Sequence, residues 1–175
     1  MSGAWLFGKL PSHGDFVCRG LGLEERTELD AWLSEEMAGA RLALAADFEA
    51  AFDRAPPWRF AWRGEAGWTG GAIAASRDAA GRRFPIVIAR SGLSETAVEG
   101  AALACEEAIY EAFGEGAFEA AVRRIESRRF YEGGGAPERD GWWCPGCDPL
   151  AEVRREGRRP AGLLVAMLTL TEAPA

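Results

Sequence analysis

Large aromatic residues alternate with other residues directly after a proline pair. Trp58, Phe60 and Trp62 follow Pro56 and Pro57 at every second position. Because successive side chains of a β-strand point to opposite faces, this spacing places three large rings on one face. We therefore predict a strand over residues 58–63 whose aromatic face is buried.

The rest of the chain predicts further strands and helices around this strand. Apolar residues three, four or seven apart predict a helix over 24–54, with Gly39 as a place where it divides. The continuous apolar run 84–89 predicts a central strand that is covered on both faces, with Pro85 near its start. We also predict strands over 5–10, 68–75 and 163–170, helices over 98–113, capped by Ser94, and 118–125, and a short element beginning at Trp142.

Single strands and one hairpin are thus interleaved with long helices, which indicates an α/β class with helices on both faces of one mixed sheet. The length of 175 residues is typical of one domain, so we expect residues 1–175 to form a single domain. Apolar residues make up 48% of the sequence, enough for a substantial core.

The charge of the chain disfavours two classes of partner. Twenty basic and 27 acidic residues give a net charge of −7, and this field repels nucleic acid and anionic membrane surfaces. The longest nearly unbroken apolar stretch, 161–170, is shorter than the roughly 20 residues of a membrane helix. The first ten residues do not resemble a secretory signal, so we expect a cytoplasmic protein with reduced cysteines and no membrane span.

One motif has the Cys-x-x-Cys spacing that is found in redox-active and metal-binding sites. In Cys144-Pro-Gly-Cys147 the pair could lower the pKa of one thiol or bind a metal. A thioredoxin-like motif lies early, at the start of a helix, whereas this one lies late and is followed by Asp148-Pro149. A structural zinc site needs four ligands, and the other candidates, Cys18, Cys105 and His13, are scattered along the chain. We favour a turn that contains two thiols.

Neighbouring polar residues near the N-terminus do not form a catalytic triad. Ser12, His13 and Asp15 are too close in sequence to reach one another in the order that a triad requires, and we expect His13, the only histidine, to lie in a solvated loop. The stretch from Gly8 also lacks the order of a phosphate-binding loop. Two groups of arginines are expected on solvated surfaces, the first paired with Glu119 and Glu126: Arg123, Arg124, Arg128 and Arg129, and Arg154, Arg155, Arg158 and Arg159.

Polar residues beside glycines suggest an internal ion pair. Arg82 and Arg83 are adjacent, so at most one of them can meet an acid inside the fold, and the other is expected to be free. We predict that Asp15 or Asp78 pairs with one of these arginines and ties the first loop to the entrance of the strand at 84–89. If Asp15 is the partner, Asp15→Ala destabilises the fold by roughly 3 to 5 kcal/mol.

Two blocks of sequence resemble the TagF (ImpM) family associated with bacterial type VI secretion. The first block is Gly8-Lys9-Leu10-Pro11-Ser12-His13-Gly14-Asp15-Phe16-Val17, with Trp32-Leu33 downstream. The second contains Trp58-Arg59-Phe60, Gly71-Ala72-Ile73 and the segment from Ser76 to Pro85, and Trp142-Trp143 is similar to the late tryptophan pair of the family. Ala75 departs from the pattern, where a proline is expected, and the motif at Cys144 has no counterpart in it.

The resemblance implies a three-layer α/β/α sandwich and no catalytic activity, cofactor or metal. It also implies a post-translational repressor of type VI secretion that binds the forkhead-associated-domain scaffold or another component of the threonine-phosphorylation pathway. The alternatives are a thiol oxidoreductase or metal-binding protein acting through Cys144 and Cys147, and a structural component of the secretion machine. The candidate motif or partner-binding residues are Lys9, Pro11, Gly14, Asp15, Phe16, Ser76, Asp78, Gly81, Arg82, Phe84, Pro85, Trp142 and Trp143. Whether their loops form an interface or define the fold is left open by the sequence.

Overall fold

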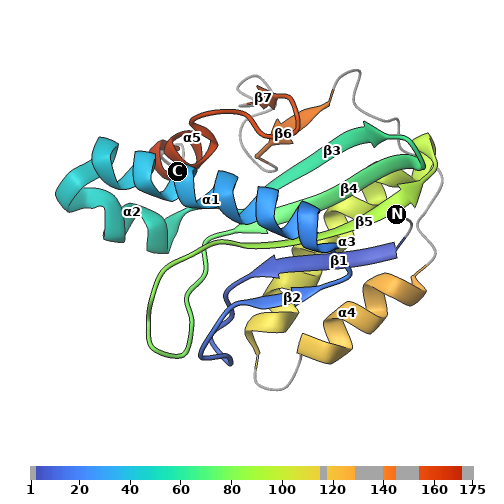
Figure 1. Ribbon diagram of the computed structural model, residues 1–175, viewed down its shortest axis with the longest axis horizontal. Helices are drawn as coiled ribbons and strands as arrows, with labels where there is room; N and C mark the ends of the chain where they lie inside the picture. Colours follow the sequence, from blue (N-terminus) through green and yellow to red (C-terminus); the bar gives the residue numbers. More distant parts are fainter. Residues whose placement is uncertain (1–2, 115–117, 129–139, 145–153, 171–175) are drawn as a thin grey trace, which may run out of the picture.

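A single seven-stranded sheet organises the chain in the computed structural model, which describes residues 3–114, 118–128, 140–144 and 154–170 (Figure 1). The strand order is β2-β1-β5-β4-β3-β6-β7. All the neighbouring pairs are antiparallel, so the expected mixed sheet is wrong. The strands are β1 (Gly3–Gly8), β2 (Val17–Arg19), β3 (Trp58–Gly64), β4 (Gly67–Ala74), β5 (Ile86–Leu93), β6 (Gly141–Trp143) and β7 (Arg154–Glu156).

Helices pack on both faces of the sheet, as Figure 1 shows for α1 in front and α3 behind. One buried cluster joins Trp58, Phe60 and Trp62 of β3 to residues of α1, α2 and α5, which confirms the predicted aromatic face. The alternate strand residues, such as Ile86 and Ile88, pack with α3 and α4. The helices are α1 (Leu23–Leu44), α2 (Phe48–Arg54), α3 (Val98–Phe113), α4 (Phe118–Ser127) and α5 (Leu163–Thr169), with 3₁₀ turns η1 (Ala45–Asp47) and η2 (Glu95–Ala97).

The long N-terminal helical segment divides at Ala45 and not at Gly39. Gly39 stays helical with open space where a Cβ would lie, so the glycine costs the helix only its propensity. Ala45 instead has φ 47°, an uncommon conformation for a residue with a side chain. The break starts η1 and turns α2 back, so that Phe48 and Phe52 join the same core as Leu33 and Met37 of α1.

The apolar run near the C-terminus is a helix, so the strand expected over 163–170 is wrong. Leucine, alanine and methionine favour helices, and a short apolar run cannot be assigned by periodicity alone. Buried Glu36 on α1 fixes the start of α5, since its carboxylate accepts hydrogen bonds from the backbone N–H groups of Gly162 (2.8 Å) and Leu164 (2.9 Å).

Several smaller expectations also differ from the structure. The side chain of Ser94 precedes η2 but caps no backbone group, and the strand expected over 84–89 begins at Ile86. β2 and β7, of three residues each, carry too little pattern to be predicted. No helix in the described ranges is long and apolar enough to cross a membrane.

Candidate functional site

A buried carboxylate joins the two loops that carry the sequence motifs. The first loop, residues 9–16, connects β1 to β2, and the second loop, residues 75–85, connects β4 to β5. Oδ2 of Asp78 accepts hydrogen bonds from Lys9 Nζ (2.9 Å) and Arg82 Nε (2.7 Å). Its Oδ1 accepts from the backbone N–H groups of Ala80 (3.0 Å) and Arg82 (2.9 Å). We call Lys9, Asp78 and Arg82 the Asp78 clasp. Burial alone raises the pKa of Asp78, but the hydrogen bonds from Lys9 and Arg82 lower it by more, so the pKa lies well below its ordinary value.

Further hydrogen bonds fasten the first loop to the clasp. Arg82 Nη2 donates to the carbonyl of Gly14 (2.8 Å), and the backbone N–H of Ala79 donates to the carbonyl of His13 (2.8 Å). The buried hydroxyl of Ser76 donates to the carbonyl of Lys9 (2.7 Å). The predicted tie between the first loop and the strand entrance is therefore present.

The acid in this tie is Asp78, and Asp15 has no part in it. The side chain of Asp15 is exposed, and among the described residues it accepts a hydrogen bond only from the backbone N–H of its neighbour Phe16 (2.8 Å). A carboxylate in that position holds no buried cation, so the condition on which a large cost of Asp15→Ala was expected is not met. Sequence reasoning also missed Lys9 as the second cation of the pair.

The two adjacent arginines point to different partners. Arg82 meets Asp78, as expected of one of the two, but Arg83 is not free. Its Nε and Nη2 donate to both carboxylate oxygens of Asp53 (2.9 and 2.7 Å), and its Nη1 lies 3.1 Å from Glu49 Oε2. The hydrogen bond from Arg83 is the main cause of a lowered pKa at Asp53. Arg83 therefore fastens the second loop to α2.

Aromatic packing completes the junction of the two loops. The ring of Phe16 stacks on Phe7 (centroids 5.6 Å apart) and meets Phe84 edge to face (4.8 Å). Lys9 Nζ lies 5.0 Å from the centroid of Phe16. At Gly8, with φ 140°, a Cβ would lie 2.1 Å from the carbonyl oxygen of Pro85, so no side chain fits there. Phe16 remains 38% exposed, whereas Phe84 is buried.

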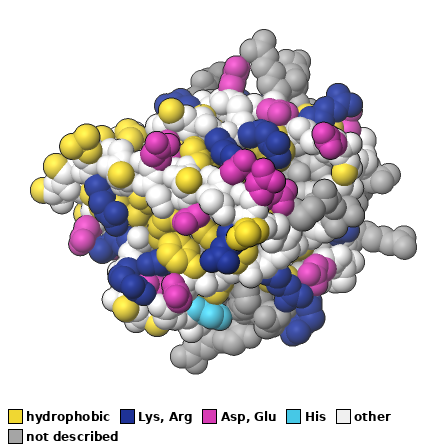
Figure 2. Space-filling view, viewed as in Figure 1, with side chains coloured by type: hydrophobic (Ala, Val, Ile, Leu, Met, Phe, Trp, Pro, Cys, Tyr) yellow, Lys and Arg dark blue, Asp and Glu magenta, His cyan; other side chains and the backbone are white. Residues whose placement is uncertain are grey.

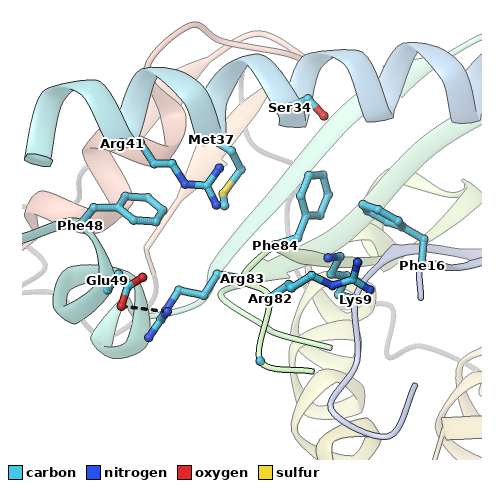
Figure 3. A pocket seen from close by; sticks show the side chains of 11 residues that line it. Lys9, Phe16, Ser34, Met37, Arg41, Phe48, Glu49, Arg82, Arg83 and Phe84 are labelled. Atoms are coloured by element: carbon cyan, nitrogen blue, oxygen red, sulfur yellow. Dashed lines mark ion pairs between the residues drawn. The ribbon is translucent and has the colours of Figure 1, made fainter. Parts of the chain in front are cut away.

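An open groove of about 520 Å³ lies between this junction and the helices α1 and α2. We call it the basic groove. Figure 3 shows Lys9, Arg82 and Phe16 on one side, Arg41, Met37 and Phe48 on the other, and Phe84 between them. Its lining consists of Lys9, Phe16, Ser34, Met37, Arg41, Phe48, Glu49, Gly81, Arg82, Arg83 and Phe84.

The α1 side of the groove was missed by the sequence analysis. Ser34, Met37 and Arg41 are three, four and seven positions apart, so they share one face of the helix. This spacing could have grouped them, but only the fold brings them opposite the motif loops. The guanidinium of Arg41 lies 5.1 Å from the ring centroid of Phe48.

The lining carries four cations and one acid, Glu49, in a chain whose net charge is negative. Figure 2 shows the same face, on which hydrophobic side chains gather among lysine and arginine side chains. Lys9 and Arg83 are occupied by their ion pairs. Arg41 is exposed and has no acidic partner within the described ranges, and Arg82 keeps Nη1 without a partner there while its side chain is 62% exposed.

The remaining candidate residues lie outside the groove. Pro11 and Ser76 line a separate hollow beside Phe52. Trp142 belongs to the core, 4.3 Å from Phe60 between ring centroids, and Trp143 packs with α3 residues near the other edge of the sheet. The structure therefore does not bring the tryptophan pair to the motif loops.

The groups considered for thiol, metal and triad chemistry do not converge in the described part of the chain. Cys144 and Cys105 are buried, and burial raises the pKa of the Cys105 thiol. Cys147 lies outside the described residues. No cluster of three metal-ligating side chains occurs among the residues that the structure describes. Ser12 Oγ lies 2.9 Å from Nδ1 of half-exposed His13, while exposed Asp15 accepts only from Phe16.

The arginine clusters are exposed, as expected, but their partners come from other elements. Arg124 pairs with Glu111 and Arg128 with Glu107, both on α3, and Glu126 pairs with Arg19. In the second cluster Arg159 pairs with Glu28 (2.8 Å). Arg129, the side chain of Glu119 and the glycine-rich stretch 133–137 lie outside what the structure describes.

Comparisons with known proteins identify the family of the chain and a protein of similar fold. Residues 5–132 match the family model described as the TagF N-terminal domain, Type VI secretion system-associated. The chain is also similar to the crystal structure of PA0076 from Pseudomonas aeruginosa PAO1, with 22% sequence identity and a TM-score of 0.72. That similarity covers 98% of this chain and 97% of the other, and at this identity it shows the fold alone. No curated protein gives a significant match.

Proposed function

Because the chain belongs to the type VI secretion system-associated TagF N-terminal domain family, we propose that it is a non-enzymatic repressor of type VI secretion. It acts after translation by binding another protein of the system in the cytoplasm. The partner in this proposal is the forkhead-associated-domain scaffold or another component of the threonine-phosphorylation pathway.

One observation supports this proposal above the others. Of the motif residues, Lys9, Phe16, Gly81, Arg82 and Phe84 lie together along one open groove. Within the described ranges the groove holds no thiol, no histidine and no cluster of metal ligands, so its chemistry suits recognition better than turnover. A binding protein needs only an exposed surface that fits one state of its partner, and it then represses by sequestration.

The hydrophobic core also supports the proposal of a single domain over residues 1–175. Leu163, Leu164 and Met167 of α5 pack in one cluster with Leu29 and Leu33 of α1. The C-terminal helix therefore shares its core with the first helix, although the family match ends at residue 132.

Secretion assays with altered gene dosage test the function directly. We expect deletion of the gene to raise the release of the secretion tube protein and overexpression to lower it. The opposite sign would refute repression and favour a structural component of the machine. Replacing both Cys144 and Cys147 by serine is expected to leave repression intact, and its loss would favour the thiol alternative.

A binding measurement tests the partner. We expect the purified full chain to bind the purified forkhead-associated-domain scaffold in a calorimetric titration. If it binds only the kinase or phosphatase of the pathway, the scaffold is the wrong partner while repression by binding still stands.

A further inference from the structure

We infer that the basic groove binds an acidic peptide segment of the partner, one that places an oxyanion on Arg41 and an apolar side chain on Phe16, with Arg82 on the Phe16 side as a second cation. This inference rests on the proposed function, since it names the chemistry that the same groove recognises. The oxyanion is a carboxylate or a phosphorylated hydroxyl, two sources of one chemistry.

The free donors of the groove carry the electrostatic part of the inference. Arg41 has no acidic partner in the described ranges, and its guanidinium lies 5.1 Å from the ring centroid of Phe48. Arg82 is held at Nε and Nη2, whereas Nη1 has no partner in the described ranges and the side chain is 62% exposed. Guanidinium groups with spare donors bind carboxylate and phosphate oxygens through charge-assisted hydrogen bonds.

Contacts within the chain limit the orientations of both arginines before a ligand arrives. Asp78 and the carbonyl of Gly14 hold Arg82, and the Phe48 ring holds Arg41 on the opposite side (Figure 3). Less side-chain entropy is therefore lost on binding. A segment laid across the groove meets both cations.

The apolar part of the inference rests on Phe16. Phe16 is one of five large hydrophobic residues in the described ranges that are exposed, at 38%, and it lies on the same side of the groove as Arg82. Its ring is braced by Phe7 and Phe84, so it presents a fixed surface. A rigid aromatic ring next to arginines is the composition typical of energetic centres in protein interfaces.

The charge of the whole molecule favours a short acidic segment over a long polyanion. Four cations line the groove, but the chain carries a net charge of −7, and Glu49 and Asp53 lie at its α2 end. A nucleic acid would extend from the groove over an acidic surface that repels it. A peptide with a few acids ends before it reaches that surface.

Peptide selection on the purified full chain tests the inference. A library of random peptides displayed on phage is the probe, and we expect the enriched sequences to contain acidic residues next to a leucine or an aromatic residue. Failure to enrich any sequence, or enrichment of sequences without acids, would overturn the inference.

Substitutions then locate the binding. Affinity of the best peptide is measured by fluorescence polarisation with the parent, Arg41→Gln, Phe16→Ala and the matched control Arg26→Gln. Arg26 is an exposed arginine on the same helix, about 22 Å from Arg41 by the helical rise. We expect Arg41→Gln and Phe16→Ala each to weaken binding about tenfold, and Arg26→Gln by less than about twofold. Equal effects at Arg26 and Arg41 would overturn the inference.

Two further comparisons distinguish a carboxylate from a phosphate, and the failure of this inference from the failure of the proposed function. The same peptide with phosphothreonine in place of one acid binds more tightly if the natural group is a phosphate and more weakly if it is a carboxylate. If acidic peptides bind through Arg41 but gene dosage leaves secretion unchanged, the proposed function fails and the site stands. If secretion is repressed but peptide binding does not depend on Arg41, the inference alone fails.

Discussion

The two sides of the basic groove are built in opposite ways. On the motif side, the Asp78 clasp is closed: Asp78 is 2% exposed and each of its oxygens accepts two hydrogen bonds. On the helix side, Arg41 is exposed, its guanidinium lies over the ring of Phe48, and it has no acidic partner among the described residues. The motif residues therefore mainly hold the two loops together, and the proposed partner surface also includes the α1 side of the groove, which carries no motif residue.

The largest effect is expected from opening the clasp. Asp78→Ala leaves Lys9 and Arg82 without their shared carboxylate, and an uncompensated buried charge is strongly destabilising. We expect the melting temperature to fall by about 10 °C. The matched control is Asp15→Ala, expected to change it by less than about 2 °C because Asp15 is exposed. Equal shifts in thermal melts of the two variants would contradict the assignment of Asp78 as the buried partner.

A slightly smaller effect is expected from the aromatic pair that joins the two motif loops. Phe84 is 7% exposed and Phe16 is 38% exposed, although their rings are in contact. Phe84→Ala opens a cavity and is expected to cost about 3 kcal/mol, whereas Phe16→Ala is expected to cost less than about 1 kcal/mol. Chemical denaturation of both variants measures the difference. A larger cost at Phe16 would place that residue in the core and remove it from the proposed interface.

Acid titration gives the next effect, and its sign follows from the lowered pKa values. Hydrogen bonds from Lys9 and Arg82 outweigh burial and lower the pKa of Asp78, and Arg83 lowers that of Asp53. As the pH falls, these carboxylates therefore bind protons in the unfolded chain before they do in the folded chain. Their contribution to the free energy of unfolding is present above about pH 4 and is lost as the pH falls toward the folded pKa values.

The matched variant for this titration is Asp78→Asn. We expect it to melt lower than the parent at neutral pH but to lose less stability between pH values of about 5 and 2, because one of the two carboxylates with a lowered pKa is gone. Melting curves at several pH values test this. Parallel declines of parent and variant would show that Asp78 contributes nothing to the acid dependence.

Much of the secondary structure was predictable from the sequence, and the failures have physical reasons. Alternation at 58–62 and helical spacing at 24–54 report local structure, and both predictions were confirmed. Strand direction depends on which strands become neighbours, so the antiparallel sheet was not predictable from patterns within strands. The apolar run 163–170 fits helix or strand equally well until Glu36, from a distant part of the chain, fixes its first turn.

The candidate site, too, was predictable only in part. The sequence predicted a carboxylate and arginine tie but could not choose between Asp15 and Asp78, since burial decides the pairing and burial is a property of the fold. Sequence spacing gave no reason to connect Arg41 with a motif that begins before residue 20 and resumes at residue 76. Asp53 was missed as the partner of Arg83 for the same reason.

The smallest effect on stability, with a large effect on binding, is expected at Arg41. Arg41→Gln removes a charge from the last turn of α1, where a cation interacts with the helix dipole, so we expect a cost below about 1 kcal/mol. Arg26→Gln, in the first turns of the same helix, is expected to leave stability equally intact. In cells that overexpress each variant, we expect Arg41→Gln to relieve repression of tube-protein release and Arg26→Gln to repress like the parent. Since both variants remain folded, a difference between them separates recognition from stability, and equal repression would move the partner surface away from this side of the groove.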